Sequence, residues 1–320
     1  MAKQSVASRR LTPAEKAVAR RKLGSLATLR IPPGLRKKYG GAIDKFFTYM
    51  RREGKLLPEL VDVLDDDLCE YVEECWENGD PRSWCVDLMS GIAKFDPALK
   101  NYYPLARTFV ETWKLHELPE RASPVSLELL KALVSYIVEV QKDTMLGACL
   151  LLTFHCMLRI GECLGLVVKD VTRSSASALL DLGLTKGGKR RNERESVEAT
   201  DGSTLAFLDV AMKGRLPGDR IFPLSYQEFN KRFHELVKVF GLSGFNFKSH
   251  SFRRGGTTYE FRGHGSYDII CQRGRWASQR TARLYIAEAI ELTNTLAFST
   301  QTTKMVKSHA AAFEKLVAAE

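Results

Sequence analysis

The sequence has no long apolar run and no paired-cysteine pattern. Its longest apolar stretch, "LGACLLLTF", is far shorter than the ~20 residues that a membrane-spanning helix needs. The first residues are basic and contain no apolar segment of the kind found in secretory signals, so we expect no signal peptide. The seven cysteines form no CxxC pair and are odd in number. These absences argue against a membrane protein or a disulfide-stapled secreted protein, and they favour a reducing intracellular compartment.

Acidic residues are almost missing from the first forty positions. Residues 1–40 hold eleven Lys and Arg against a single Glu, whereas the other 280 residues carry 37 charges of each sign. The net charge of +10 therefore lies entirely in this segment. A basic arm on a neutral body fits a polyanion partner, because each cation that approaches a phosphate releases a counterion. A tail that only improves solubility is the alternative.

What is present is typical of a folded protein with two domains. The 320 residues are 44% hydrophobic and 27% charged, enough to build two separate cores. Between residues 40 and 117, apolar residues recur at helical spacing, and the series Leu68, Val72 and Cys75 is an example. The segment therefore predicts a compact helical domain over 40–117, preceded by a flexible basic arm over 1–39.

A second domain is predicted to follow a linker at residues 118–125. Two prolines lie in "HELPERASPVSLELL", and Ser126 is a candidate N-cap for the next helix. The following helical segments enclose residues 166–210, where three strand-like segments joined by a Gly-Gly turn predict a small antiparallel sheet. These segments are "LVVKDV", "SALLDLGLTKGGKRRNERESVEA" and "LAFLDV". This domain, over residues 126–300, is therefore expected to be mainly α-helical. The fold class of the whole chain is mainly α with a small antiparallel β-sheet (α+β).

Cys149, Cys156 and Cys163 recur every seven residues in an apolar helical run. Such a series can be interpreted as one face of a metal site. Free cysteines are among the most buried residue types, however, and buried small hydrophobic side chains are the interpretation we favour.

The stretch "HSFRRGGTTY" concentrates groups that bind anions. His250 and Arg253 are three positions apart and share a helix face, so both can address one small anion. Trp276 follows 23 residues after Arg253, and Tyr285 nine residues later, on a helix that Ser278 can cap. The segment therefore predicts an anion site with two aromatic residues downstream of it.

Two further candidates lie upstream of this stretch. "LRIGE" places Arg159 and Glu162 at the same spacing of three, where a carboxylate can hold a guanidinium in place. "TKGGK" places Lys186 just before the predicted turn, with Lys189 directly after the glycines.

The order Arg–Lys–HxxR–Trp–Tyr, with these spacings, resembles the tyrosine recombinase (phage integrase) family. "HSFRRGG" is especially similar to the recombinases of DIRS-like and Crypton-like mobile elements. The resemblance covers residues 124–290 by motif, whereas for 40–117 it rests on helical content and order alone.

The resemblance implies a role for each residue. Two always-charged guanidinium forks suit the non-bridging oxygens of a DNA phosphate, and the hairpin lysine suits the leaving oxygen as a general acid. The implied set is Tyr285 as nucleophile, Arg159 and Arg253 on the phosphate, Lys186 as the acid, His250 in proton transfer, Trp276 as an N–H donor and Glu162 in support. Trp276 replaces the commoner histidine, and Lys189 is an open alternative to Lys186. No cofactor and no metal are implied.

The family also implies an architecture and partners. A helical core-binding (SAM-like) domain and a catalytic domain would form a C-shaped clamp around double-stranded DNA. Recombination through a 3′-phosphotyrosyl intermediate and a Holliday junction would need a homotetramer on two DNA sites, from a monomer or dimer off DNA. The biological role would be integration or excision of a mobile element, in the nucleus of a eukaryotic host or the cytoplasm or nucleoid otherwise. No membrane is implied.

Two alternative functions remain open from the sequence. A domesticated DNA-binding protein would keep the fold without recombination, and a type IB topoisomerase-like enzyme would share the chemistry as a monomer.

A helix is predicted over residues 301–320, after the polar connector "LAFSTQTT", and it carries one apolar stripe that must be buried. It can pack on its own domain, or, as we expect, dock in trans on a neighbouring one.

Overall fold

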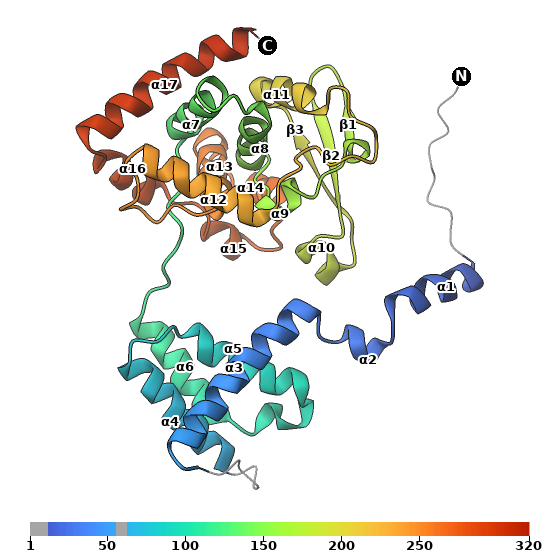
Figure 1. The fold of residues 1–320 in the computed structure, drawn as a ribbon, viewed down its shortest axis with the longest axis vertical. Helices are drawn as coiled ribbons and strands as arrows, with labels where there is room; N and C mark the ends of the chain where they lie inside the picture. The colour runs from blue at the N-terminus through green and yellow to red at the C-terminus, as the bar shows by residue number, and fades with distance from the viewer. Residues whose placement is uncertain (1–11, 56–62, 320) are drawn as a thin grey trace. The chain divides into compact units, whose positions relative to one another are not determined.

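Figure 1 shows a computed structural model of the chain, which describes residues 12–55 and 63–319. The chain forms two compact units, residues 1–120 and residues 121–320, which we call the N-terminal and C-terminal units. No helix in the described part of the chain is both long and apolar enough to cross a bilayer.

The N-terminal unit is helical throughout its described residues. Helix α3 packs against α5, and α4 packs against α6, around a core that includes Phe46, Leu68 and Trp113. The elements are α1 (Pro13–Leu23), α2 (Leu26–Leu29), α3 (Pro33–Arg52), α4 (Leu64–Glu77), α5 (Ser83–Phe95), the 3-10 helix η2 (Pro97–Asn101) and α6 (Pro104–His116).

Much of the predicted basic arm is helical. Helix α1 begins with a capping box between Thr12 and Glu15, and none of its side chains is buried. Helix α3 begins at Pro33, and Ile31 before it is buried, so the helical domain starts inside the segment predicted as an arm. The remainder of that arm, residues 1–11, lies outside the described residues.

The C-terminal unit combines helices with one small sheet. The three strands pair antiparallel in the order β1-β2-β3, with Leu180 of β2 opposite Val171 on one side and Val197 on the other. The elements up to the sheet are α7 (Leu127–Glu139), α8 (Thr144–His155), α9 (Ile160–Cys163), η3 (Val168–Asp170), β1 (Val171–Arg173), β2 (Ala178–Gly183), α10 (Lys186–Arg191) and β3 (Glu195–Ala199). Those after it are α11 (Gly202–Met212), α12 (Tyr226–Val239), α13 (His250–His264), α14 (Tyr267–Gly274), α15 (Gln279–Arg283), α16 (Glu288–Leu296) and α17 (Thr300–Ala319). The predicted fold class is confirmed.

Two local predictions in this region were wrong. The apolar segment "LAFLDV" was expected to be a strand, but it lies within α11, whose first turn is capped by the Asp201 side chain. A short apolar run cannot be distinguished from a buried helix by periodicity alone, and Leu205 and Phe207 are indeed buried. The paired glycines after Lys186 were expected to form a hairpin turn, but they belong to the first turn of α10.

The glycine pair of "HSFRRGG" allows α13 to lie directly against neighbouring backbone. A Cβ on Gly255 would be 1.9 Å from the carbonyl oxygen of Val125, and one on Gly256 would be 2.0 Å from that of Phe154. The Val125 N–H donates to the Ser251 oxygen at 3.1 Å. The end of the predicted linker is therefore fixed to the C-terminal unit along the helix that carries His250.

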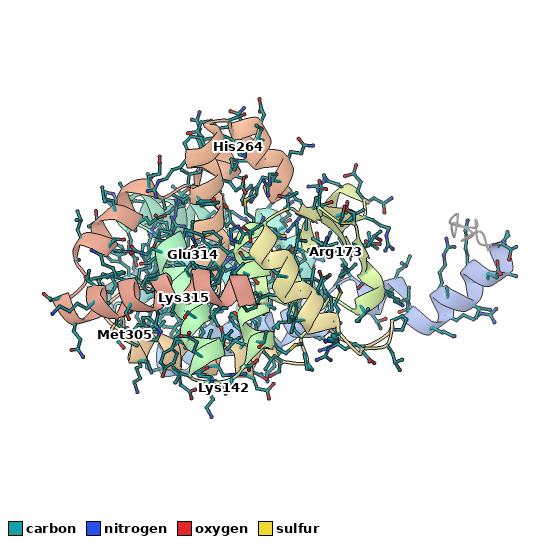
Figure 2. The ribbon with its side chains drawn as sticks, turned by 90° about the horizontal axis from the view of Figure 1, so that it is seen from above. Lys142, Arg173, His264, Met305, Glu314 and Lys315 are labelled. Atoms are coloured by element: carbon teal, nitrogen blue, oxygen red, sulfur yellow. The ribbon has the colours of Figure 1, made fainter. Side chains whose placement is uncertain are left out.

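Helix α17 packs along α7 of its own chain (Figures 1 and 2). Val306 and Phe313 are buried in the core of the C-terminal unit, and Lys131 of α7 pairs with Glu314 at 2.5 Å. In this single chain the apolar stripe of α17 therefore packs in cis, on its own unit. This arrangement was the alternative to the expected docking in trans. The connector is also shorter than predicted, since only residues 297–299 separate α16 from α17.

Candidate active site

Arg159 and Glu162 meet at the start of α9, as their spacing predicted. The Arg159 backbone N–H donates to Glu162 Oε2 at 2.9 Å, and its guanidinium pairs with Glu162 Oε1. Burial raises the pKa of Glu162, but Arg275 and the Arg159 N–H outweigh it, so that the pKa lies below its ordinary value. Glu162 is therefore a carboxylate held in its charged form by the arginines around it.

Arg253 is fully buried on α13. Its Nη1 donates to the Met157 oxygen at 2.5 Å and its Nη2 to the Gly274 oxygen at 2.6 Å. Met157 and Arg275 have left-handed backbone, with φ of 47° and 59°, which is uncommon for residues other than glycine and tends to occur at functional sites. Burial, together with Arg275 and Arg159, lowers the pKa of Arg253 to about 9.

Trp276 and Tyr285 cover the Arg253 guanidinium. Their ring centroids are 4.6 Å apart, and the Arg253 guanidinium carbon lies 4.6 Å from the Trp276 ring and 5.5 Å from the Tyr285 ring. A Cβ at Gly274 would overlap the indole, so this glycine makes room for Trp276. The structure thus brings together an arginine and two aromatic residues that are spread over more than thirty positions of the sequence.

Tyr285 lies just beyond α15, not within it. Ser278 caps α15 as predicted, accepting from the Thr281 N–H at 3.3 Å, but the helix ends at Arg283. The segment is anchored by Thr258, whose hydroxyl accepts from the Ala287 N–H at 3.1 Å. The phenol is half-buried in the short connection between α15 and α16.

His250 is the first residue of α13, and it is accessible to solvent although protein atoms surround part of its ring. Partial burial of the ring, together with Arg253 and Arg159, lowers its pKa from the ordinary histidine value. At neutral pH its imidazole is therefore uncharged and able to accept a proton.

A cleft of about 340 Å³ joins Arg159 to Lys186. Glu162 and Thr185 also line it, and Thr185 caps α10 through its hydroxyl, which accepts from the Gly188 N–H at 3.1 Å. Lys186 is thus the exposed first residue of α10, on the connection between β2 and β3. Lys189, the alternative candidate, lies on the same helix but not among the residues that line this cleft.

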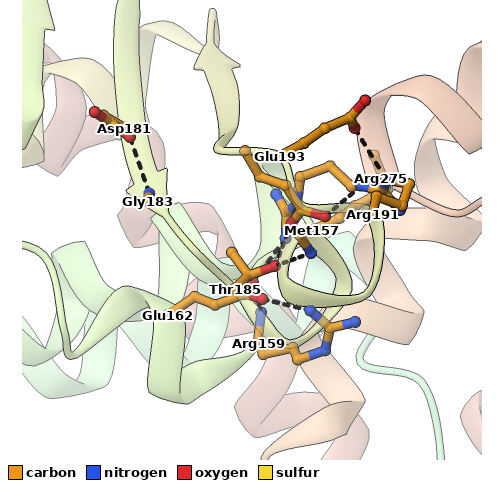
Figure 3. Close-up of polar contacts among 12 residues, drawn as sticks. Met157, Arg159, Glu162, Asp181, Gly183, Thr185, Arg191, Glu193 and Arg275 are labelled. Atoms are coloured by element: carbon orange, nitrogen blue, oxygen red, sulfur yellow. Dashed lines mark hydrogen bonds and ion pairs between the residues drawn. The ribbon is translucent and has the colours of Figure 1, made fainter. Parts of the chain in front are cut away.

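Two residues of this site, Arg275 and Glu195, were not predicted from the sequence. Arg275 Nη2 donates to Glu162 Oε2 at 2.6 Å, and its Nε lies 3.3 Å from Glu195 Oε2 (Figure 3). The guanidinium and the Glu195 carboxylate are buried, and only 11% of the Glu162 side chain is exposed. The signal available was slight, because Arg275 directly precedes Trp276 in "RGRW", while nothing in the spacing connects it to Glu195.

The three regularly spaced cysteines lie in the core beside this site. Cys149, Cys156 and Cys163 are buried and unpaired, with the Sγ atoms of Cys149 and Cys163 3.6 Å apart. Burial in apolar surroundings raises the pKa of Cys156 to about 12.

The profile of the phage integrase family matches residues 125–291, just over half of the chain. The chain therefore belongs to this family, and it is a tyrosine recombinase. The matched region contains each residue of the candidate site. No curated protein sequence matches the chain.

Solved structures of two integrases have a similar fold. The Tn1549 transposon integrase in complex with transposon right end DNA is similar over 88% of this chain and 98% of its own, with a TM-score of 0.58 and 13% identity. A lambda integrase dimer bound to a COC′ core site is similar over 85% of this chain and 94% of its own, with a TM-score of 0.59 and 15% identity. At such identities the likeness concerns the fold.

Proposed function

We propose that this protein is a site-specific DNA recombinase that cleaves and rejoins strands through a tyrosyl phosphodiester. The observation that carries the proposal is the group of cations around Glu162, with a phenol over one of them. Arg159 and Lys186 share a cleft, and Arg253 lies beneath Trp276 and Tyr285. A guanidinium binds phosphate bidentately, so such a group of cations suits a phosphodiester.

The proposed step is an in-line displacement at phosphorus. The Tyr285 oxygen attacks, its proton passes to His250, and a P–O bond forms as the bond to the 5′-oxygen breaks. Lys186 gives a proton to that leaving oxygen, and the product is a 3′-phosphotyrosyl bond with a free 5′-hydroxyl. Arg159 and Arg253 stabilise the charge on the non-bridging oxygens. The reverse displacement by another 5′-hydroxyl rejoins the strands without an external energy source.

The side chain of Arg253 needs to be uncovered for this step. Its two terminal nitrogens donate to backbone carbonyls, and both aromatic rings lie over it. Swinging the Tyr285 ring off Trp276 would expose the guanidinium and free the phenol at the same time. The short connection between α15 and α16 is a suitable place for that movement.

Double-stranded DNA is the proposed partner. The solved integrases with a similar fold are bound to DNA, and the described part of the basic segment includes Arg20, Arg21 and Lys22 at the end of α1. We propose further that the two units clamp the duplex, that a homotetramer assembles on two sites, and that the reaction serves a mobile element. Exchange between sites would proceed through a Holliday junction.

Replacing Tyr285 by Phe tests the nucleophile. The variant removes one oxygen, so we expect it to bind DNA with nearly wild-type affinity and to form no covalent complex. The measurement is a denaturing gel of protein incubated with a nicked suicide substrate. Tyr259→Phe is the matched control, because Tyr259 is 41% exposed on α13 and packs beside Phe154. A covalent band that persists in the Tyr285 variant and disappears in the Tyr259 variant would refute the assignment.

A further inference from the structure

Arg275 is a buried cation between two parts of the C-terminal unit. Only 5% of its side chain is exposed, and it contacts two carboxylates that are largely buried as well, Glu162 at 2.6 Å and Glu195 at 3.3 Å. Glu162 belongs to α9 and pairs with Arg159, whereas Glu195 is the first residue of β3. Arg275 therefore joins the arginine side of the cleft to the sheet (Figure 3).

Glu195 in turn holds the connection that carries Lys186. It accepts from the Thr185 hydroxyl at 2.6 Å and from Arg191 Nη2 at 2.5 Å, so it fixes both ends of α10. A Cβ at Gly187 would be 2.8 Å from Glu195 Oε1, which shows how closely the carboxylate lies under the first turn. Lys186 directly follows Thr185, so its backbone is fixed one residue away from this contact.

The link between this connection and the helices runs through Glu195. Among the described residues, and leaving the Arg190 side chain aside, the ion pair between Arg275 and Glu195 joins the first residue of β3, which holds both ends of α10, to the helical part of the unit. Lys186 and Leu184 are themselves exposed. Arg275 is thus placed to influence the position of Lys186 relative to Arg159.

Stability alone is a poor explanation for Arg275. Buried ion pairs contribute little net stability, because the loss of hydration offsets the attraction. Arg275 also adopts left-handed backbone, with φ of 59°, and its Nη1 and Nε are buried without a hydrogen-bond partner, so that Nε contacts Glu195 as an ion pair only. Each of these features lowers the stability of the folded chain, so a residue whose role is packing alone would not be expected to combine them.

We propose that Arg275 is a positioning residue for Lys186, which holds the connection between β2 and β3 against Glu162 so that Lys186 faces the phosphate bound by Arg159. This inference rests on the proposed function, in which Lys186 protonates the leaving 5′-oxygen. The planar guanidinium can reach two carboxylates at once, whereas the single ammonium of a lysine cannot do so in the same geometry.

The test compares two leaving groups in single-turnover cleavage. One suicide DNA carries a normal phosphodiester, and the other carries a 5′-bridging phosphorothiolate, whose thiolate leaves without a proton. On the normal substrate we expect K186A to slow cleavage about 100-fold, and R275M and E195Q about tenfold or more. On the phosphorothiolate we expect K186A to return to within about tenfold of wild type, and R275M and E195Q to within about twofold. Glu198→Gln, at an exposed position of β3, is the matched control.

The same data can overturn the proposal. R275M that is equally slow on both substrates would mean that Arg275 acts on the phosphate or on the fold. If R275M does not fold, E195Q decides, because a glutamine keeps the shape of the side chain and removes the charge that attracts Arg275 and Arg191. E195Q with wild-type rates on both substrates would refute the positioning role.

Other results distinguish a failure of the proposed recombinase function from a failure of the proposed role of Arg275. Wild type that forms no covalent complex on either DNA would refute the recombinase proposal, and the inference about Arg275 with it. Wild type that cleaves, together with K186A that the phosphorothiolate does not rescue, would refute only the role of Lys186 and its positioning.

Discussion

Glu162 contacts more catalytic candidates than any other carboxylate of the site. It pairs with Arg159 and Arg275, and its Oε2 is 3.8 Å from Arg253 Nη1. A single negative charge thus lies among three buried or half-buried guanidiniums. Their mutual repulsion lowers the pKa of Arg253 and Arg275 beyond the effect of burial, and Glu162 opposes that shift. A bound phosphate would add the negative charge that this group of arginines lacks.

His250 provides a prediction at the residue scale. Its pKa is below the ordinary value near ~6.5, and its neutral form is the one that can accept the Tyr285 proton. Cleavage at subsaturating DNA should therefore be independent of pH near neutrality and should fall only below about pH 6.5. In His250→Gln the acid limb should be absent and the rate about 100-fold lower.

His264→Gln is the control for this profile, because His264 is 48% exposed at the other end of α13. The fold must be monitored in parallel, since burial lowers the pKa of His155 too. A lowered folded-state pKa means that the stability His155 contributes is complete above its unfolded-state value and is lost as the pH falls through the folded-state value. An acid limb that persists unchanged in His250→Gln while the fold is intact would exclude His250 as its source.

At the scale of elements, α17 is part of the core of its own unit. Phe313 is 2% exposed and stacks on Phe207 with 6.3 Å between centroids. Phe313→Ala should lower the free energy of unfolding by about 3–5 kcal/mol at any protein concentration. Urea unfolding at two concentrations measures this.

Leu296→Ala is the control for this substitution. The side chain of Leu296 is 77% exposed at the end of α16, so its loss should change the free energy of unfolding by less than about 0.5 kcal/mol. A Phe313→Ala protein that unfolds like wild type as a monomer, but fails to assemble on DNA, would instead support docking of α17 in trans.

For the whole molecule, the boundary between the units can be located by truncation. The N-terminal and C-terminal units have separate cores, so a fragment of residues 121–320 should fold alone. Residues 121–125 belong to it, because Val125 is fully buried and the Ala122 oxygen accepts from Arg254 Nη1 at 2.5 Å.

A fragment of residues 126–320 should therefore be less stable by about 3 kcal/mol or more, since it loses a buried valine and leaves Arg254 without its carbonyl. Denaturant unfolding of the two fragments, compared with the full chain, measures the difference. Equal stability of the two fragments would place the boundary at the end of the predicted linker instead.

The sequence by itself determined the catalytic candidates and the fold class. Helical periodicity is a local property, so the main helices and the shared face of His250 and Arg253 followed from the order of residues. The joint order and spacing of Arg159, Lys186, the HxxR pair of His250 and Arg253, Trp276 and Tyr285 indicated the family. These features depend on short segments and on their order along the chain.

Only the tertiary structure decided which groups cover one another. Arg253 is buried because carbonyls of Met157 and Gly274, from segments far apart in the chain, approach its guanidinium. Arg275 reaches Glu162 across 113 positions. Periodicity shows which face of an element is apolar, but not which other element packs on that face. For the same reason, the helical state of residues 205–210 and the packing of α17 on α7 emerged only from the folded chain.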